Sequence, residues 1–246
     1  MRSLHLLVAA VLLPAPLVAQ APLPTASAVL ARYRAAVGAD AAQRFTSLRS
    51  TGSFEMPAAG VKGSVVLDQA APNKMKMTIS VPGLGEIAQG FDGKTGWGLD
   101  PMQGPRVLGG SELADVQEMA DLGAGVRAER LIKSATSVER TTKNGAACVL
   151  VEITMTTGRT SRDCYADATG LLVWSSSKRA TPMGEVDVVT LYSDYKATNG
   201  VSFPMRAVTE MMGQQQIIAL EAILPNAPVG DLTTLPAPIA ALVRKP

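Results

Sequence analysis

Histidine is almost absent from this 246-residue sequence: the chain contains a single histidine, His5. His5 lies in an N-terminal segment with the pattern of a cleavable signal peptide, so the predicted mature chain contains none. A Ser-His-Asp triad, a Cys-His pair and the usual zinc sites all need an imidazole group. The sequence therefore argues against most hydrolases, and we expect no enzyme, no metal site and no cofactor.

A hydrolase that uses two carboxylates could still work without histidine. No pair of acidic residues stands out, because the acidic residues of the C-terminal half fall at turns or at outward strand positions. We predict that solvent surrounds these side chains, which are Asp163, Asp167, Glu185, Asp187 and Asp194.

The chain also lacks an excess of either positive or negative charge. The chain has 23 Lys and Arg residues against 21 Asp and Glu residues, and no basic run stands out. Aromatic residues make up only 4% of the chain and do not alternate with basic ones. A nucleic-acid partner is therefore not expected.

Residues 1–19 combine a basic start at Arg2, an apolar run from Leu4 to Val18 and small residues at the end, as a secretory signal peptide does. Pro14 and Pro16 interrupt the run, and a membrane-spanning helix would need about 20 apolar residues. We place cleavage after Ala19, with Ala21 as the alternative. No cysteine follows the run to accept a lipid, so we expect a soluble periplasmic product without a membrane span, and a monomer.

Only two cysteines are present, Cys148 and Cys164, and they flank a predicted hairpin turn at Thr157-Gly158. Because an exported protein meets an oxidising compartment, we predict one disulfide on the outer face of the hairpin. Counted from the turn, the two residues are not directly opposite, so an irregular loop or bulge would have to set the register. Two separate thiols are the alternative.

Runs of alternating apolar and polar residues, separated by tight-turn signals, dominate the sequence from Ser47 onward. Lys74 to Val81 alternates completely, which is the pattern of a strand with one dry and one wet face. Asp92-Gly93 and Asn144-Gly145 are strong hairpin signals. The segment from Asp163 to Arg206 reads as three strands and two tight turns. The pattern predicts a mainly β, α+β fold with a large, curved antiparallel sheet of about eleven strands.

Two helical segments are predicted to cover this sheet. One precedes Gly38, and the other runs from an N-cap at Ser111 to about Leu122. Gly104-Pro105, before the second helix, is interpreted as a turn. We predict a single domain over residues 20–246, with a core of about 26–224 and an irregular, Pro-rich tail over 225–246.

A curved sheet lidded by helices can enclose an apolar cavity. Eleven methionines would suit a surface that adapts to variable apolar partners. The alternative is a fully packed core built from the same side chains. The predicted lining consists of one strand face and one helix face, with Trp97 near the rim: Leu48, Phe54, Met75, Met77, Ile79, Phe91, Trp97, Leu113 and Met119.

Four phrases, and the order of the predicted elements, resemble a known family. They are VLARYRAAVGAD (29–40), GFDGKTGW (90–97), DATGL (167–171) and SDYKATNGVSFPMR (193–206). The chain resembles the periplasmic lipoprotein-carrier superfamily, the LolA/LolB-like proteins that sort outer-membrane lipoproteins, over roughly residues 26–224. The resemblance implies an incomplete β-barrel lidded by helices, with an apolar cavity for acyl chains and no cofactor or catalysis.

Two functions from different classes follow. The first is a non-catalytic periplasmic carrier that binds a lipid, a lipoprotein acyl chain or another apolar ligand. The alternative is an interaction or scaffold module for envelope or membrane proteins, with a packed core and no internal ligand. The two differ in whether the space between sheet and helices is filled.

Overall fold

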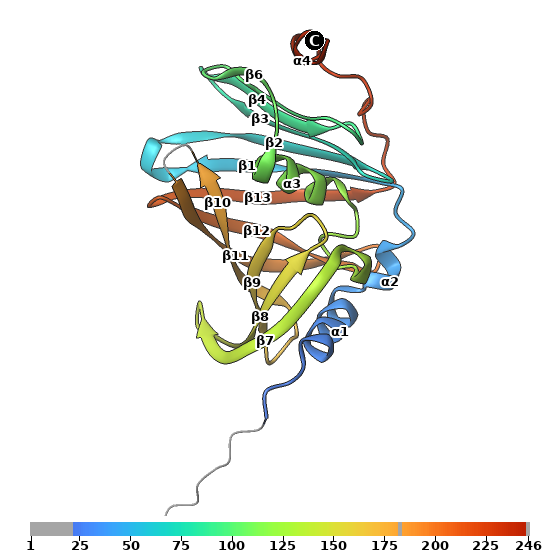
Figure 1. Ribbon diagram of the computed structural model, residues 1–246, viewed down its shortest axis with the longest axis vertical. Helices are drawn as coiled ribbons and strands as arrows, with labels where there is room; N and C mark the ends of the chain where they lie inside the picture. The colour runs from blue at the N-terminus through green and yellow to red at the C-terminus, as the bar shows by residue number, and fades with distance from the viewer. Residues whose placement is uncertain (1–21, 182–183, 245–246) are drawn as a thin grey trace, which may run out of the picture.

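A computed structural model describes residues 22–181 and 184–244 (Figure 1). The predicted signal peptide lies outside the described residues. The N-terminal half consists of α1 (Ala26–Val37), α2 (Ala39–Ala42), β1 (Ser47–Met56), the 3-10 helix η1 (Pro57–Ala59), β2 (Val61–Ala70), β3 (Lys74–Val81), β4 (Gly85–Phe91), β5 (Gly96–Asp100) and β6 (Gly104–Val107). Next come α3 (Gly110–Ala120), η2 (Glu129–Leu131), β7 (Ile132–Lys143), β8 (Ala146–Met155), β9 (Thr160–Ala166), β10 (Leu172–Thr181), β11 (Gly184–Thr198), β12 (Val201–Met211), β13 (Gln214–Pro225) and α4 (Ala237–Val243).

One antiparallel sheet of thirteen strands runs through the described chain, in the order β6-β5-β4-β3-β2-β1-β13-β12-β11-β10-β9-β8-β7. The predicted number, about eleven, is wrong. The sheet curves without closing, so β6 and β7 form its two edges (Figure 1). Strand β6 was missed because Gly104-Pro105 reads as a turn; proline is tolerated there because β6 is an edge strand.

The sheet order determines where α3 must lie. Strands β6 and β7 follow one another in the chain but form opposite edges of the sheet. The connection between them therefore has to cross one face, and it contains α3. Figure 1 shows α3 in front of the sheet, within its curve. We call the face that carries α1 and α3 the inner face and the other the outer face.

The hairpins are formed as their turn residues predict. Asn144 and Gly145 have φ angles of 48° and 76°, and Asn199 and Gly200 have φ angles of 50° and 81°. Two consecutive positive φ angles are the signature of a type I′ turn, which matches the twist of the strands it joins. These turns align β7 with β8 and β11 with β12.

Helix α1 begins and ends at sequence signals. The Thr25 side chain accepts a hydrogen bond from the Ala28 amide, and Gly38 ends the helix in the left-handed conformation. A Cβ atom at Gly38 would lie 2.0 Å from the carbonyl oxygen of Gly200, so only glycine fits. The buried side of α1 includes Leu30 and Tyr33, which pack against strands β8, β9 and β12.

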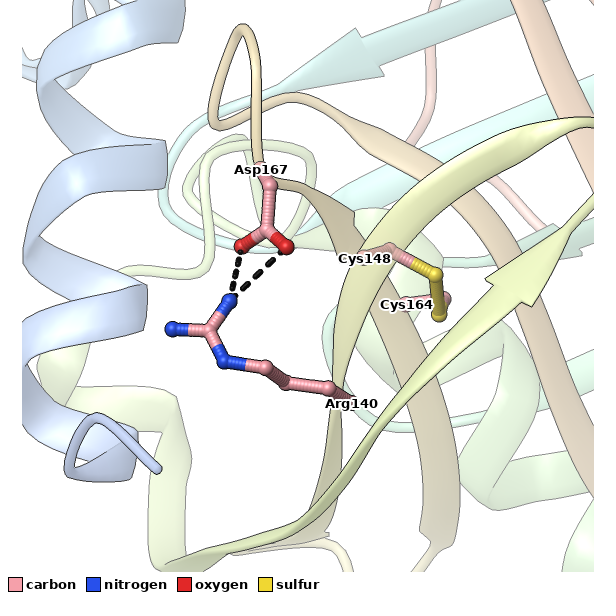
Figure 2. The surroundings of a disulfide bond; sticks show 4 residues. All are labelled: Arg140, Cys148, Cys164 and Asp167. Carbon is pink, nitrogen blue, oxygen red and sulfur yellow. Dashed lines mark hydrogen bonds and ion pairs between the residues drawn. A yellow bond between two sulfur atoms is a disulfide. The ribbon is translucent and has the colours of Figure 1, made fainter. Parts of the chain in front are cut away.

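Cys148 and Cys164 form the predicted disulfide (Figure 2). Cys148 lies opposite Ala166 and Cys164 lies opposite Leu150, so the bridge is diagonal across β8 and β9. This strand pair shows no register shift, so the expected irregularity is wrong. Both cysteines lie on the outer face, as predicted, yet they are fully buried in a small cluster with Leu150 and Trp174.

The disulfide lies beside the attachment point of α1. Figure 2 shows Arg140 of β7 paired with Asp167, 2.8 Å apart, in the turn that follows β9. Arg32 of α1 donates hydrogen bonds to the carbonyl oxygens of Asp167 and Ala168 at 2.6 and 3.2 Å. The turn at Asp167 and Ala168, which follows the disulfide-linked strand β9, thus binds α1 through Arg32.

The C-terminal segment from residue 225 was predicted to be irregular. Residues 226–236 contain neither helix nor strand, but residues 237–243 form helix α4, so the prediction is wrong there. Helix α4 packs on β6, with Ile239 completely buried against Trp97 and Ala88 on the outer face. Pro236 precedes the first helical turn, where a missing amide hydrogen costs nothing. The tail therefore adds a cover to the outer face of the sheet.

Candidate functional site

The inner face carries a cluster of apolar side chains on β1, β2, β3 and β13. Phe54 in β1 lies opposite Ile218 in β13, and Val65 in β2 lies opposite Ile79 in β3. Met77 packs both here and against the α3 cluster, so this cluster and α3 share one face. We call the set the inner apolar patch: Phe54, Met56, Val61, Val65, Met77, Ile79, Val81, Ile218 and Leu220.

Helices flank the inner apolar patch but do not contribute to it. Helix α3 packs on β3, β4 and β5, whereas α1 packs on β7 and β12. Within the described chain, the patch contains no residue of the four α-helices. Its border residues, including Met56, Ile218 and Leu220, are only half buried. The central strands thus present apolar side chains between two helices that cover neighbouring parts of the sheet.

The nine residues predicted to line a cavity fall into different environments. Phe54, Met77 and Ile79 belong to the inner apolar patch. Leu48 is buried in β1, on the same side of the strand as Phe54. Met75 of β3 and Phe91 of β4 pack against α3, and the last two predicted residues, Leu113 and Met119, belong to that helix and join the same cluster.

The position predicted for Trp97, at the rim of the inner space, is wrong. Trp97 lies on the outer face, where it packs against Ile239 of α4. Its ring covers Gly90 so closely that a Cβ atom there would lie 2.4 Å from it. At the neighbouring Gly96, an added Cβ atom would lie 2.7 Å from the Leu113 side chain of α3, so this position faces inward. Successive strand residues face opposite sides of the sheet. Because a glycine precedes and follows Trp97, no alternation of apolar and polar residues indicated which face its side chain occupies.

Beneath the two helices lies a cluster of buried charges. Arg127 follows α3 and is only 8% exposed, and its guanidinium group donates to Asp163 at 2.7 and 3.0 Å. Asp163 is completely buried and also accepts a hydrogen bond from the Tyr165 hydroxyl at 3.1 Å. The prediction that Asp163 is solvated is therefore wrong. Arg127 also lies 3.4 Å from Glu118 of α3.

The buried charges connect three parts of the fold. Asp163 belongs to β9, Glu118 to α3, and Arg127 to the segment between α3 and β7. The Tyr33 hydroxyl of α1 donates to the carbonyl oxygen of Gly125 at 2.6 Å. Arg159, next to the start of β9, binds Glu118 with two hydrogen bonds. Polar contacts therefore attach α3 to the start of β9 and attach α1 to the segment that follows α3, in addition to packing.

The environment shifts the pKa values of this cluster. Burial raises the pKa of Tyr165 well above its ordinary value, and the nearby charge of Asp163 raises it further. Burial also raises the pKa of Tyr33. Burial lowers the pKa of Arg127, but the attraction of Asp163 together with the contributions of Tyr165, Tyr33 and Tyr192 outweighs this, so its pKa lies above the ordinary value. The tyrosines therefore stay neutral and Arg127 stays charged.

Two clefts open around the helices. One, of about 1140 Å3, lies between α1, α2, the 71–73 turn and the segment that follows α3. Its wall is rich in alanine, and the pairs Arg34–Glu129 and Arg130–Asp121 lie beside it. The other, of about 710 Å3, lies between the N-terminal half of α3 and the ends of β8 to β11. None of the nine predicted residues lines either cleft.

Residue types suited to metal chemistry do not gather in the described chain: residues 22–181 and 184–244 contain no group of three His, Cys, Asp or Glu side chains that could hold a metal ion. Over the same residues, every helix is too short or too polar to cross a membrane.

Comparison with known proteins identifies the fold. No family model matches the sequence, and no curated protein matches it. The structure is similar to a LolA superfamily protein from Nitrosomonas europaea, with a TM-score of 0.54, 13% identity, and coverage of 83% of this chain and 96% of that one. It is also similar to a DUF1329 family protein from Desulfovibrio piger, with a TM-score of 0.56, 13% identity, and coverage of 82% and 95%. The fold is therefore LolA-like, at a sequence divergence that leaves only the fold in common.

Proposed function

We propose that this LolA-like chain is a non-catalytic periplasmic binding protein that carries a lipid, a lipoprotein acyl chain or another apolar ligand. The observation that supports this most is the inner apolar patch. A carrier needs apolar surface that is sheltered but not permanently covered, and the half-buried border of the patch offers such a surface. Each methylene group that the patch removes from water would contribute about 0.8 kcal/mol.

The periplasmic location is part of the proposal. The signal-peptide pattern of residues 1–19 supports export, and the Cys148–Cys164 disulfide fits an oxidising compartment. The chain would act as a monomer, and ligand release would follow a movement of the helices. The packed cluster beneath α3 favours the second candidate, an interaction module for envelope proteins, because part of the predicted cavity is filled there.

Ligand content separates the two candidates. Protein purified from the periplasm without detergent should carry a co-purified apolar molecule in native mass spectrometry, and delipidated protein should take up a fluorescent fatty acid. Glutamate at the patch should abolish uptake, because a carboxylate there would have to be desolvated beneath an acyl chain. The test variant is Leu220→Glu, which adds this charge to the half-buried border of the patch.

Leu224→Glu is the matched control. Leu224 lies on the same strand, but it is 49% exposed and pairs with Arg49, away from the patch. It should retain uptake, and both variants should show cooperative thermal unfolding. If no apolar molecule co-purifies and the unmodified protein takes up no fluorescent fatty acid, the carrier proposal is wrong and the interaction module is favoured.

A further inference from the structure

The 710 Å3 cleft at α3 differs in chemistry from the rest of the inner face. We call it the hydroxyl cleft, because residues with side-chain hydroxyl groups from three elements and one hairpin turn line it. They are Ser111, Thr157, Thr160, Ser161, Ser176 and Ser177. Ser161 of β9 and Ser177 of β10 are directly paired across the strands, which brings their Cβ atoms to about 4.5–5.5 Å. Pockets of about 300–1,000 Å3 are the usual size of small-molecule sites.

One of these hydroxyl groups lacks a partner. Ser161 is only 3% exposed, and within the described chain its Oγ atom has no hydrogen-bond partner. A buried hydroxyl without a partner costs free energy, so such groups are rare unless something binds them. Because Ser161 lines the hydroxyl cleft, a ligand there could supply the missing hydrogen bond.

The N-terminus of α3 contributes further donors. The helix begins at Gly110 after Gly109, and no side chain caps its first amide groups, so the predicted N-cap at Ser111 is wrong. Gly110 and Ser111 line the cleft. The first amide groups of a helix have no partner within the helix, and an acceptor atom in the cleft can bind them.

Charges around the hydroxyl cleft favour a neutral ligand. The lining includes three cations, Arg159, Arg162 and Lys178, and four carboxylates, which belong to Asp115, Glu152, Glu185 and Asp187. Most of them are paired: Arg162 with Glu152 at 3.1 Å, and Lys178 with Glu185 at 3.7 Å. A phosphate would meet four carboxylates, and a cation would meet the guanidinium groups, so neither is favoured.

The lining also disfavours apolar ligands. Its largest apolar side chain is that of Ala114, and it contains no aromatic ring. An acyl chain would find little apolar area there, and a nucleobase would find nothing to stack on. A ring with many hydroxyl groups fits, because each hydroxyl both donates and accepts, and the cleft offers carboxylate acceptors, guanidinium and amide donors, and further hydroxyls.

We propose that the hydroxyl cleft binds a neutral saccharide group, either as a free oligosaccharide or as the head group of a glycolipid. The proposal goes beyond the carrier function and does not depend on it. The cleft and the inner apolar patch lie toward the same end of the sheet, because the β8–β9 and β10–β11 hairpins lie at the same end as the β1–β2 and β12–β13 hairpins. A glycolipid could thus occupy both.

Amide chemical shifts of the full mature chain test the proposal. Titration with maltose or N,N'-diacetylchitobiose should shift the amide resonances of Gly158, Ser161 and Ser177 in a saturable way. Ser161→Ala should weaken binding about 2- to 12-fold, the equivalent of one neutral hydrogen bond. Ser137→Ala is the matched control, because Ser137 of β7 also has a buried hydroxyl without a partner in the described chain but lies outside the cleft. It should bind like the unmodified protein.

A second titration distinguishes the two sources of the saccharide. Octyl glucoside below its micelle concentration should shift the same amides. If octyl glucoside binds while the disaccharides do not, and Leu220→Glu weakens octyl glucoside binding, the natural saccharide is a lipid head group. If the disaccharides bind and Leu220→Glu has no effect, the natural ligand is a free oligosaccharide. Three results would overturn the proposal: no saturable shift with any of these probes, equal effects of Ser161→Ala and Ser137→Ala, or tighter binding of inorganic phosphate at the same amides.

Discussion

Replacing Arg127 by methionine should destabilise the protein far more than removing any exposed ion pair. Arg127→Met leaves the carboxylate of Asp163, which is completely buried, with a single hydrogen bond from the neutral Tyr165 hydroxyl. Glu118 keeps its two hydrogen bonds from Arg159, so the uncompensated charge is that of Asp163 alone. Breaking a buried pair by removing one partner costs about 3–5 kcal/mol, and we expect a loss in that range.

Urea unfolding at neutral pH measures this loss, with an unchanged dependence on urea showing that the two-state transition is preserved. Arg140→Met is the matched control. Arg140 pairs with Asp167 at 2.8 Å (Figure 2), but the two side chains are 43% and 36% exposed. An exposed pair contributes about 0–1 kcal/mol, so Arg140→Met should stay within that range. Both residues are arginines of the C-terminal half, and the comparison isolates burial.

The double variant Arg127→Met with Asp163→Leu completes the test. When both charges are replaced by apolar side chains of similar size, the desolvation cost disappears together with the attraction, and the change is often neutral or stabilising. We therefore expect the double variant to recover most of the stability that Arg127→Met loses. If Arg127→Met costs less than 1 kcal/mol, or if the double variant recovers nothing, the charge of Asp163 is not held by Arg127 as described.

Two further outcomes are expected. Burial raises the pKa of Tyr33, Tyr165 and Tyr195 above their ordinary value of 10.0. Because these tyrosines ionise near pH 10 in the unfolded chain but not in the folded chain, the free energy of unfolding should be unaffected below pH 10 and fall above it. In a pH titration, the phenolate absorbance of the native protein should therefore rise at higher pH than that of the urea-unfolded protein. In the tail, Ile239→Ala should cost about 2–5 kcal/mol, because Ile239 is fully buried against Trp97, and should shift tryptophan emission to the red. Leu242→Ala, at a position 39% exposed, should change stability by less than about 0.5 kcal/mol and leave the emission unchanged.

Local signals predicted the strands and turns, whereas the connections across the sheet could not be read from them. Asn144-Gly145 and the alternation of Lys74 to Val81 specify a turn and a strand by short-range sterics and by period, and both are present. The pairing of β1 with β13 depends on residues about 170 positions apart. That pairing makes β6 and β7 the two edges and sends α3 across the inner face, which no local pattern encodes.

The buried charges were missed for a related reason. Strand β9 carries polar residues on both faces, with Ser161 and Asp163 on one and Arg162 on the other, so alternation did not show which face is buried. Asp163 is buried because Arg127, 36 residues earlier, neutralises it from the segment after α3. A carboxylate in the middle of a strand looks solvated until its distant partner is known.

The same buried charges limit which ligands could move α3. Displacing the helix from the sheet would separate its buried Glu118 from Arg127 and Arg159, at a cost comparable to the 3–5 kcal/mol expected for breaking a buried pair. At about 0.8 kcal/mol per buried methylene, a ligand must bury roughly four to six methylene groups before it offsets that cost. If the carrier proposal holds, short fatty acids should therefore bind only where α3 stays in place, on the inner apolar patch, whereas long acyl chains can also occupy the surface that α3 covers. The ion pairs of Glu118 would then set a minimum chain length for opening, without any contact between Glu118 and the ligand.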